Sequence, residues 1–142
     1  MLPDYTAALN ALAGMIAADA EHVGLTPDEN FWTERNMPDE GDLAATLTEK
    51  GGQWDRARGI MTLRAEFELR SALLSDARAR VVAAINSAEN GFRATAMANR
   101  AGIMDVKTTA LPSNNGRDPD GRNYVSCEFT LLLSASFARG AQ

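Results

Sequence analysis

The sequence of 142 residues contains one cysteine, Cys127, and one histidine, His22. A single cysteine excludes an intramolecular disulfide and is typical of a protein that folds in a reducing compartment. Without a second histidine or a cysteine pair, the chain has no set of ligands for a zinc ion. His22 lies near the end of a predicted helix, where we expect it at the surface.

Basic residues and long apolar runs are also scarce. The chain has 14 Lys and Arg against 19 Asp and Glu, which gives a net charge of −5 and a pI near 4.8. This balance disfavours non-specific DNA binding, which needs clustered cations. No apolar run approaches the roughly 20 residues of a membrane-spanning helix. The N-terminal stretch lacks a basic region and carries Asp4, Asp19 and Glu21. We therefore expect no secretory signal peptide and no membrane contact.

Motifs for phosphate or metal binding are missing as well. The stretch "NNGRDPDGRN" (114–123) matches neither a GxGxxG nor a Walker pattern. It also lacks the alternating oxygen ligands and the closing glutamate of a calcium loop. We therefore predict no cofactor and no bound metal, and a carboxylate site on Asp118 and Asp120 is the alternative that the pattern leaves open.

What is present is a globular composition, 45% apolar and 23% charged, enough for a single domain over 1–142. Apolar residues at spacings of three and four predict a helix over 5–23 that ends at Gly24. Ser75 is the predicted N-cap of a second helix, with Arg78 and Arg80 facing outward. Its predicted buried stripe is Ala77, Val81, Ala84, Ile85 and Ala88.

Three stretches have the period of two that is typical of strands. Residues 61–69 alternate apolar and charged side chains, and the same parity runs back to Gln53, so this strand is long or is bent at Gly59. Residues 103–111 predict a second strand. A third spans 124–137, with an apolar face of Val125, Cys127, Phe129, Leu131, Leu133, Ala135 and Phe137.

The remaining segments carry turn and capping residues. Thr26 and Glu29 form a capping-box pattern that predicts a short helical turn, and residues 42–50 predict a second short helix. Residues 112–123, rich in Asn, Gly, Asp and Pro, predict a polar hairpin loop. The order of elements predicts an α+β fold in which amphipathic helices pack on one face of an antiparallel sheet.

Cys127 is adjacent to Glu128, which raises the question of a nucleophile. Side chains alternate along a strand, so the two residues point to opposite faces. Cys127 lies on the apolar face, where a thiol is inert. The sequence thus predicts a structural cysteine and no catalytic residue.

Two groups of polar residues are candidates for contacts. The first lies on or near the charged side of the strands, and we predict it to face either a lumen or a neighbouring subunit: Trp54, Arg56, Arg64, Glu66, Glu68 and Glu128. The second lies in the predicted polar loop, which suits docking to another protein: Asn114, Asn115, Arg117, Asp118, Asp120 and Arg122.

The order of elements resembles the tail terminator proteins of long-tailed bacteriophages. The resemblance covers the initial helix "YTAALNALAGMIAADAEHV", the charged strand "LRAEFELRSALL", the following helix "SDARARVVAAINSA" and the final strand "RNYVSCEFTLLLSA". Residues 26–52 and 90–102 are not matched.

The resemblance implies a structural virion protein without catalytic residues. Such a protein forms a homohexameric ring at the head-proximal end of the tail tube, stops tube growth and joins the tail to the head. It contacts tube and head-completion proteins, and DNA passes through it without specific binding. The alternatives are another connector piece, such as a head-completion (stopper) protein or a tail-tube subunit, and a small oligomeric α+β enzyme or ligand-binding module.

Overall fold

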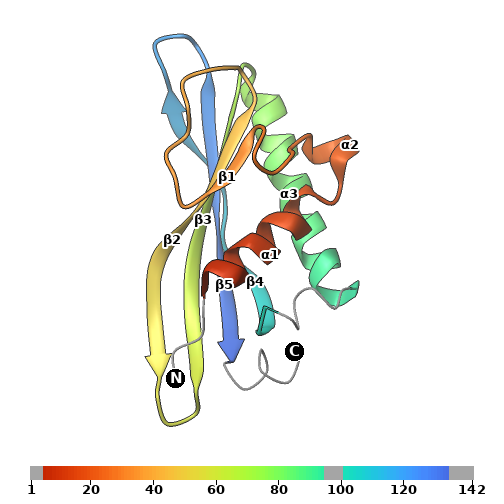
Figure 1. Cartoon of the computed structure of the whole chain (residues 1–142). Coiled ribbons are helices and arrows are strands. Elements are labelled where there is room, and N and C mark those ends of the chain that lie inside the picture. The colour runs from red at the N-terminus through yellow and green to blue at the C-terminus, as the bar shows by residue number, and fades with distance from the viewer. Residues whose placement is uncertain (1–4, 95–100, 135–142) are drawn as a thin grey trace.

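A five-stranded sheet with helices on one face forms the described part of the chain, residues 5–94 and 101–134 of a computed structural model. The strands are β1 (Phe31–Thr33), β2 (Ala44–Asp55), β3 (Ile60–Ser71), β4 (Ile103–Arg117) and β5 (Asn123–Ser134), in the order β1-β2-β3-β5-β4. The helices are α1 (Tyr5–Ala17), α2 (Ala20–Val23) and α3 (Leu74–Ala94). The predicted α+β class is confirmed (Figure 1).

The sheet is mixed, which corrects the predicted antiparallel arrangement. The short strand β1 runs parallel to β2, with Phe31 opposite Ala45, whereas the other three strand pairs are antiparallel. Phe31 then meets Phe67 of β3 edge to face, with ring centroids 5.6 Å apart. This contact anchors β1 to the core.

The core lies between the helices and the apolar face of β3 and β5. Met61, Leu63, Ala65, Phe67 and Leu69 are all buried, as the alternation predicts. The described members of the final strand's apolar face are buried too: Val125, Cys127, Phe129, Leu131 and Leu133. The predicted members Ala135 and Phe137 lie outside the described residues.

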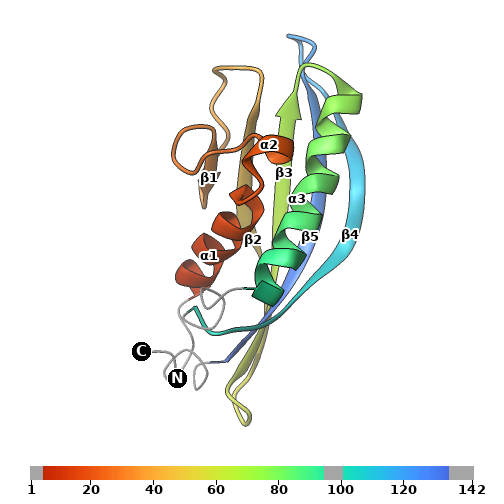
Figure 2. The same cartoon turned by 90° about the vertical axis from the view of Figure 1, so that its right-hand side faces the viewer.

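The helices cross this core side by side (Figure 2). The predicted helix over 5–23 is interrupted, because Asp19 accepts a hydrogen bond from the His22 amide and starts the separate helix α2. Helix α3 continues through Gly91, where an added Cβ would lie 3.0 Å from the side chain of Met15 on α1. Gly91 therefore permits the close approach of the two helices. Arg80 is half-buried, not outward, and donates to Val23 O at 3.0 Å.

The predicted short helix over 42–50 is wrong, because these residues lie mostly in β2. The predicted short helical turn after Thr26 is a single turn, in which the Asn30 amide donates to Thr26 O at 3.2 Å, and it leads directly into β1. The predicted long strand over 53–69 is in fact a hairpin, with β2 and β3 joined by a turn at 56–59. We call the part of this hairpin around its turn, residues 50–64, the arm, and the turn projects beyond the helices (Figures 1 and 2).

Candidate functional site

Cys127 is buried, with 2% of its surface exposed, and Val125 and Phe129 are its buried neighbours on the same face. Burial raises the pKa of the Cys127 thiol to about 12, so the thiol is protonated near neutral pH. Glu128 is only half-buried and lies on the opposite face of β5. The prediction that Cys127 and Glu128 lie on opposite faces of the strand is confirmed.

His22 and Asp19 form an exposed pair on α2. The Nδ1 atom of His22 lies 3.0 Å from Asp19 Oδ2, and the side chain of His22 is 65% exposed. This surface position was predicted. In the described residues no group of three or more Asp, Glu, His or Cys side chains could hold a metal ion.

The sheet face that points away from the helices carries the charged candidates. We call it the outer face, and Arg64, Glu66, Glu68 and Glu128 all lie on it, as the strand parity predicts. Glu66 of β3 is directly opposite Glu128 of β5. Like charges at this spacing destabilise a strand pair. Lys50 Nζ, 3.7 Å from Glu66 Oε1, partly offsets the repulsion.

Asn115 belongs to the outer face rather than to a loop. Its Nδ2 atom donates to Glu68 Oε2 at 3.0 Å and to Ser126 Oγ at 2.7 Å. The predicted loop over 112–123 is thus too long, because β4 runs to Arg117 and pairs with β5 up to Asn123. Pro112 is tolerated there because β4 is an edge strand, and the ladder shifts register around it.

Arg122 was predicted to contact a partner, and the structure corrects this prediction. The residue is only 8% exposed, and its Nε donates to Asp118 Oδ2 at 2.8 Å. Its Nη1 donates to the carbonyls of Asp39 and Gly41 in the β1–β2 loop (residues 34–43). Arg122 and Asp118 therefore hold this loop and are unavailable to a partner.

Arg70 has the same role on β3. Although its parity places it on the outer face, it is 1% exposed, beneath the β1–β2 loop. Its guanidinium donates to the carbonyls of Pro38, Glu40 and Gly41 at 2.6 to 2.8 Å. The alternation along β3 predicts the face on which Arg70 lies, but it could not predict that the β1–β2 loop covers this end of the face.

The other contact candidates are dispersed. Asn114, Arg117 and Asp120 are exposed near the β4–β5 turn. Trp54 is opposite Met61 and so lies on the helix side of the sheet, not on the outer face. Arg56 lies in the exposed turn at 56–59. The structure therefore does not place Trp54 and Arg56 with Arg64.

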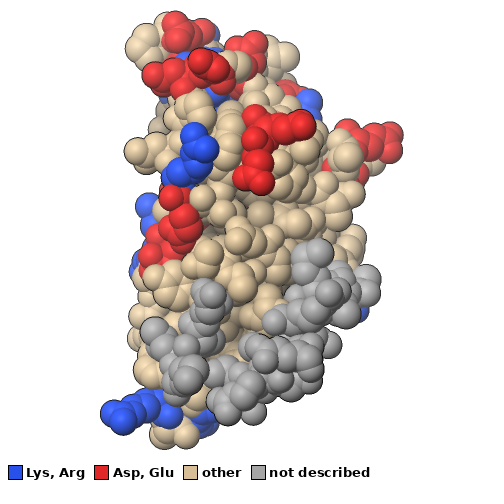
Figure 3. All heavy atoms as spheres, viewed as in Figure 1, with Lys and Arg blue, Asp and Glu red and all other residues tan. Residues whose placement is uncertain are grey.

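Charge is distributed unevenly along the sheet. Figure 3 shows acidic side chains gathered at the end where the β1–β2 loop and the β4–β5 turn lie, and basic side chains at the tip of the arm. The acidic end includes Asp39, Glu40 and Asp42. At the tip, Arg58 Nε donates to Asp55 Oδ2 at 2.8 Å, and no described residue pairs with Arg56.

Both edges of the sheet have backbone that no described strand covers. On one side β4 is the last strand over its full length. On the other side β1 covers only residues 45–47 of β2, so residues 48–55 form a free edge. Uncovered edges present unpaired N–H and C=O groups that favour pairing with another chain.

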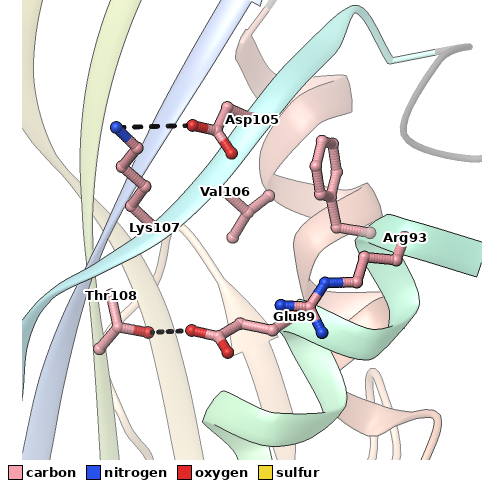
Figure 4. Close-up of a pocket in the computed structure, with 7 residues that line it drawn as sticks. Glu89, Arg93, Asp105, Val106, Lys107 and Thr108 are labelled. Carbon is pink, nitrogen blue, oxygen red and sulfur yellow. Dashed lines mark hydrogen bonds and ion pairs between the residues drawn. The ribbon is translucent and has the colours of Figure 1, made fainter.

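A pocket of about 380 Å³ opens between the last turns of α3 and the edge strand β4 (Figure 4). Each of the two elements contributes one acidic and one basic side chain to the pocket. These are Glu89 and Arg93 from α3, and Asp105 and Lys107 from β4. Thr108 donates to Glu89 at 3.4 Å, whereas Arg93 makes no ion pair within the described part of the chain. Sequence reasoning missed this pocket, because no pattern links residues of a helix end to those of a distant strand.

Among the described residues, no helix is long and apolar enough to cross a membrane. Comparison with protein-family models and with curated protein sequences finds no match.

Proposed function

We propose that the chain is a structural protein of a bacteriophage tail, the tail terminator, which forms a ring at the head-proximal end of the tail tube. The observation that carries the proposal is the pair of free sheet edges, β4 on one side and residues 48–55 of β2 on the other. In this role the chain stops tube growth, joins tail to head and has no catalytic step.

The directions of the two edges suit a ring. β2 and β3 are antiparallel, as are β3 and β5, and β5 and β4, so β2 and β4 run in opposite directions. When two copies lie side by side in the same orientation, β2 of one therefore meets β4 of the next as an antiparallel pair. Such a head-to-tail contact uses different surfaces on each copy and closes into a ring when the rotation allows.

The two free edges also lie at the same position along the strand direction, so that they are level with each other across the sheet. The rows of paired residues run from Gly52 through Leu63 and Leu131 to Val106, and from Glu49 through Ala65 and Phe129 to Thr108. The free edge of β2 is thus level with residues 103–110 of β4. The part of β4 beyond residue 110 is level with the part of β2 that β1 covers.

The outer face suits the lumen of such a ring. Arg64 is accompanied there by Glu66, Glu68 and Glu128, so the cations are not clustered. Tight DNA binding depends on several phosphate contacts from Lys and Arg. A mixed surface of this kind lets DNA pass without holding it, and the net charge of −5 fits the same role.

The proposed partners are other copies of the chain in a hexamer, the tail tube and a head-completion protein, and the proposed location is the neck of the virion. The exposed candidates of the β4–β5 turn, Asn114, Arg117 and Asp120, lie at the acidic end of the sheet. In this arrangement they belong to one rim of the ring, whereas the arm tip with Arg56 belongs to the other.

Light scattering coupled to size-exclusion chromatography, with negative-stain microscopy of the protein alone and mixed with tail tubes, tests the proposal. We expect six-fold rings that cap tube ends and prevent further tube growth. Incorporation along the tube would instead identify a tube subunit, and binding only to heads would identify a stopper protein. A strict monomer that joins neither tubes nor heads would refute all three.

A further inference from the structure

The pocket between α3 and β4 lies beside the stretch of β4 that is level with the free edge of β2. We propose that this pocket receives the side chain of Trp54 from β2 of a neighbouring copy. The inference rests on the head-to-tail ring proposed above. It specifies which residues of one copy enter which site of the next.

Strand parity places Trp54 on the same side of the sheet as the pocket. Trp54 is opposite Met61, and Val106 is level with Leu63, so Trp54 and Val106 both project to the helix side. The row through Met61 and Leu133 places Trp54 level with Ile103, which comes two residues before Asp105, the first residue of β4 that lines the pocket. Closing a sheet on itself staggers the register of its strands, and in the proposed contact a stagger of about two residues toward Asp105 brings Trp54 level with the pocket.

Trp54 is suited to a shared site. It packs on its own core but stays half-buried, so part of the indole remains uncovered at the free edge. The pocket offers Phe92, which is half-buried, and Val106, which is buried. Tryptophan residues of this kind dominate the energy of protein interfaces when they fill a pocket on the partner.

The backbone of β2 next to Trp54 allows a close approach. Gly52, level with Val106, cannot carry a side chain, because an added Cβ would lie 2.0 Å from the carbonyl oxygen of Thr62. The strand therefore presents bare backbone at this height, with Glu49 on one side of it and Trp54 on the other. The register of β2 shifts at the same point, between Glu49 and Gly52.

Charge complementarity supports the same arrangement. Glu49 is opposite Ala65 and so also projects to the helix side, level with Thr108 of the neighbour. One carboxylate oxygen of Glu49 accepts from the Gly51 amide at 2.5 Å, which leaves the other available. In the pocket, Arg93 makes no ion pair with any residue of 5–94 or 101–134. Figure 4 shows the Arg93 guanidinium on the α3 side of the pocket, near Glu89.

Three single variants and a charge swap test the proposal by analytical ultracentrifugation. We expect Trp54→Ala to weaken association about 30-fold and Trp54→Phe to recover part of the loss. Arg93→Glu is expected to weaken it about tenfold, and the double variant Glu49→Arg with Arg93→Glu to restore it. Arg78→Glu, an equal charge change at an exposed position of α3, is the control and leaves association unchanged.

A mixing experiment tests the direction of the contact. Trp54→Ala retains an intact pocket, and Arg93→Glu retains an intact Trp54. Only one of the two joints that a mixed pair can form is complete, so an equal mixture is expected to give dimers and no rings. Circular dichroism of each variant confirms the fold, and Trp54→Phe serves where Trp54→Ala does not fold.

The outcomes separate this inference from the proposed function. Rings that persist at wild-type affinity in Trp54→Ala and Arg93→Glu would refute the pocket contact and leave the ring intact. Association that both variants lose, without six-fold rings or tube binding, would support the pocket contact and refute the terminator function. A wild-type protein that is monomeric at all concentrations would refute both.

Discussion

Arg70 and Arg64 lie on the same face of β3, yet one is buried and the other exposed. Arg70 sits at the end where the β1–β2 loop folds over the sheet, and its guanidinium is bonded to three carbonyls of that loop. Arg64 sits in the arm, where its Nη2 donates to Lys50 O at 3.0 Å. Polar side chains at the covered end therefore stabilise the fold, and those at the arm remain available for contacts.

Substitution of Arg70 is expected to give the largest effect. In Arg70→Met the loop carbonyls lose their donors and the covered end loosens, at a cost of about 3 kcal/mol in the free energy of unfolding. Arg64→Met is the matched control on the same strand, and we expect a change within about 0.5 kcal/mol. Urea denaturation measures both. Equal losses would show that the two ends do not differ in the way the contacts indicate.

The sequence could predict the faces of the strands but not what covers them. The alternation of β3 and β5 identified every buried apolar position among the described residues of these strands, because parity is a property of the backbone alone. Parity assigns Arg70 to the outer face and turn residues predict an exposed loop around Arg122, but neither pattern can show the burial of the two side chains, since the loop that covers them is far away in sequence, around residue 40. Burial by a distant segment leaves no local pattern.

The strand β2 was missed for a related reason. Residues 42–50 contain Leu, Ala, Glu and Lys, which favour helices. Pairing with β3, from Ala44 opposite Arg70 onward, overrides that preference. The missed strand β2 also affected the contact candidates. Arg64, Glu66, Glu68 and Glu128 share a face of the sheet as predicted, whereas Trp54 of β2 lies on the other face.

An intermediate effect is expected in the arm. Gly52→Ala places a Cβ against the carbonyl oxygen of Thr62, so the strands must move apart, at a cost of about 2 kcal/mol. The arm is peripheral, and we expect the loss mainly as faster hydrogen exchange of the Gln53 and Thr62 amides. Gln53→Ala, at an exposed neighbouring position, is the control. Global unfolding at the same reduced stability everywhere would contradict the separation of arm and covered end.

The smallest effect concerns the pH dependence of the covered end. Burial alone would raise the pKa of Asp118, but hydrogen bonds from the Arg122 amide and guanidinium and from the Tyr124 hydroxyl lower it below its ordinary value of 3.8. A carboxylate whose pKa is lower in the folded state stabilises the fold above the unfolded pKa, and this contribution is lost as the pH falls through the folded pKa. We therefore expect the wild type to lose stability below about pH 4.

Asp118→Asn isolates this contribution, because the amide keeps the shape of the side chain without its titrating charge. At pH 7 we expect the urea midpoint of the variant to lie below that of the wild type by about 0.3 M. The gap should stay constant down to about pH 4 and then narrow toward pH 2, as Asp118 of the wild type becomes protonated. Asp120→Asn, whose side chain is 78% exposed, provides the comparison and should change little. A difference between the two urea midpoints that grows on acidification would mean that the Asp118 carboxylate destabilises the covered end. Its contact with Arg122 could not then be what holds the β1–β2 loop in place.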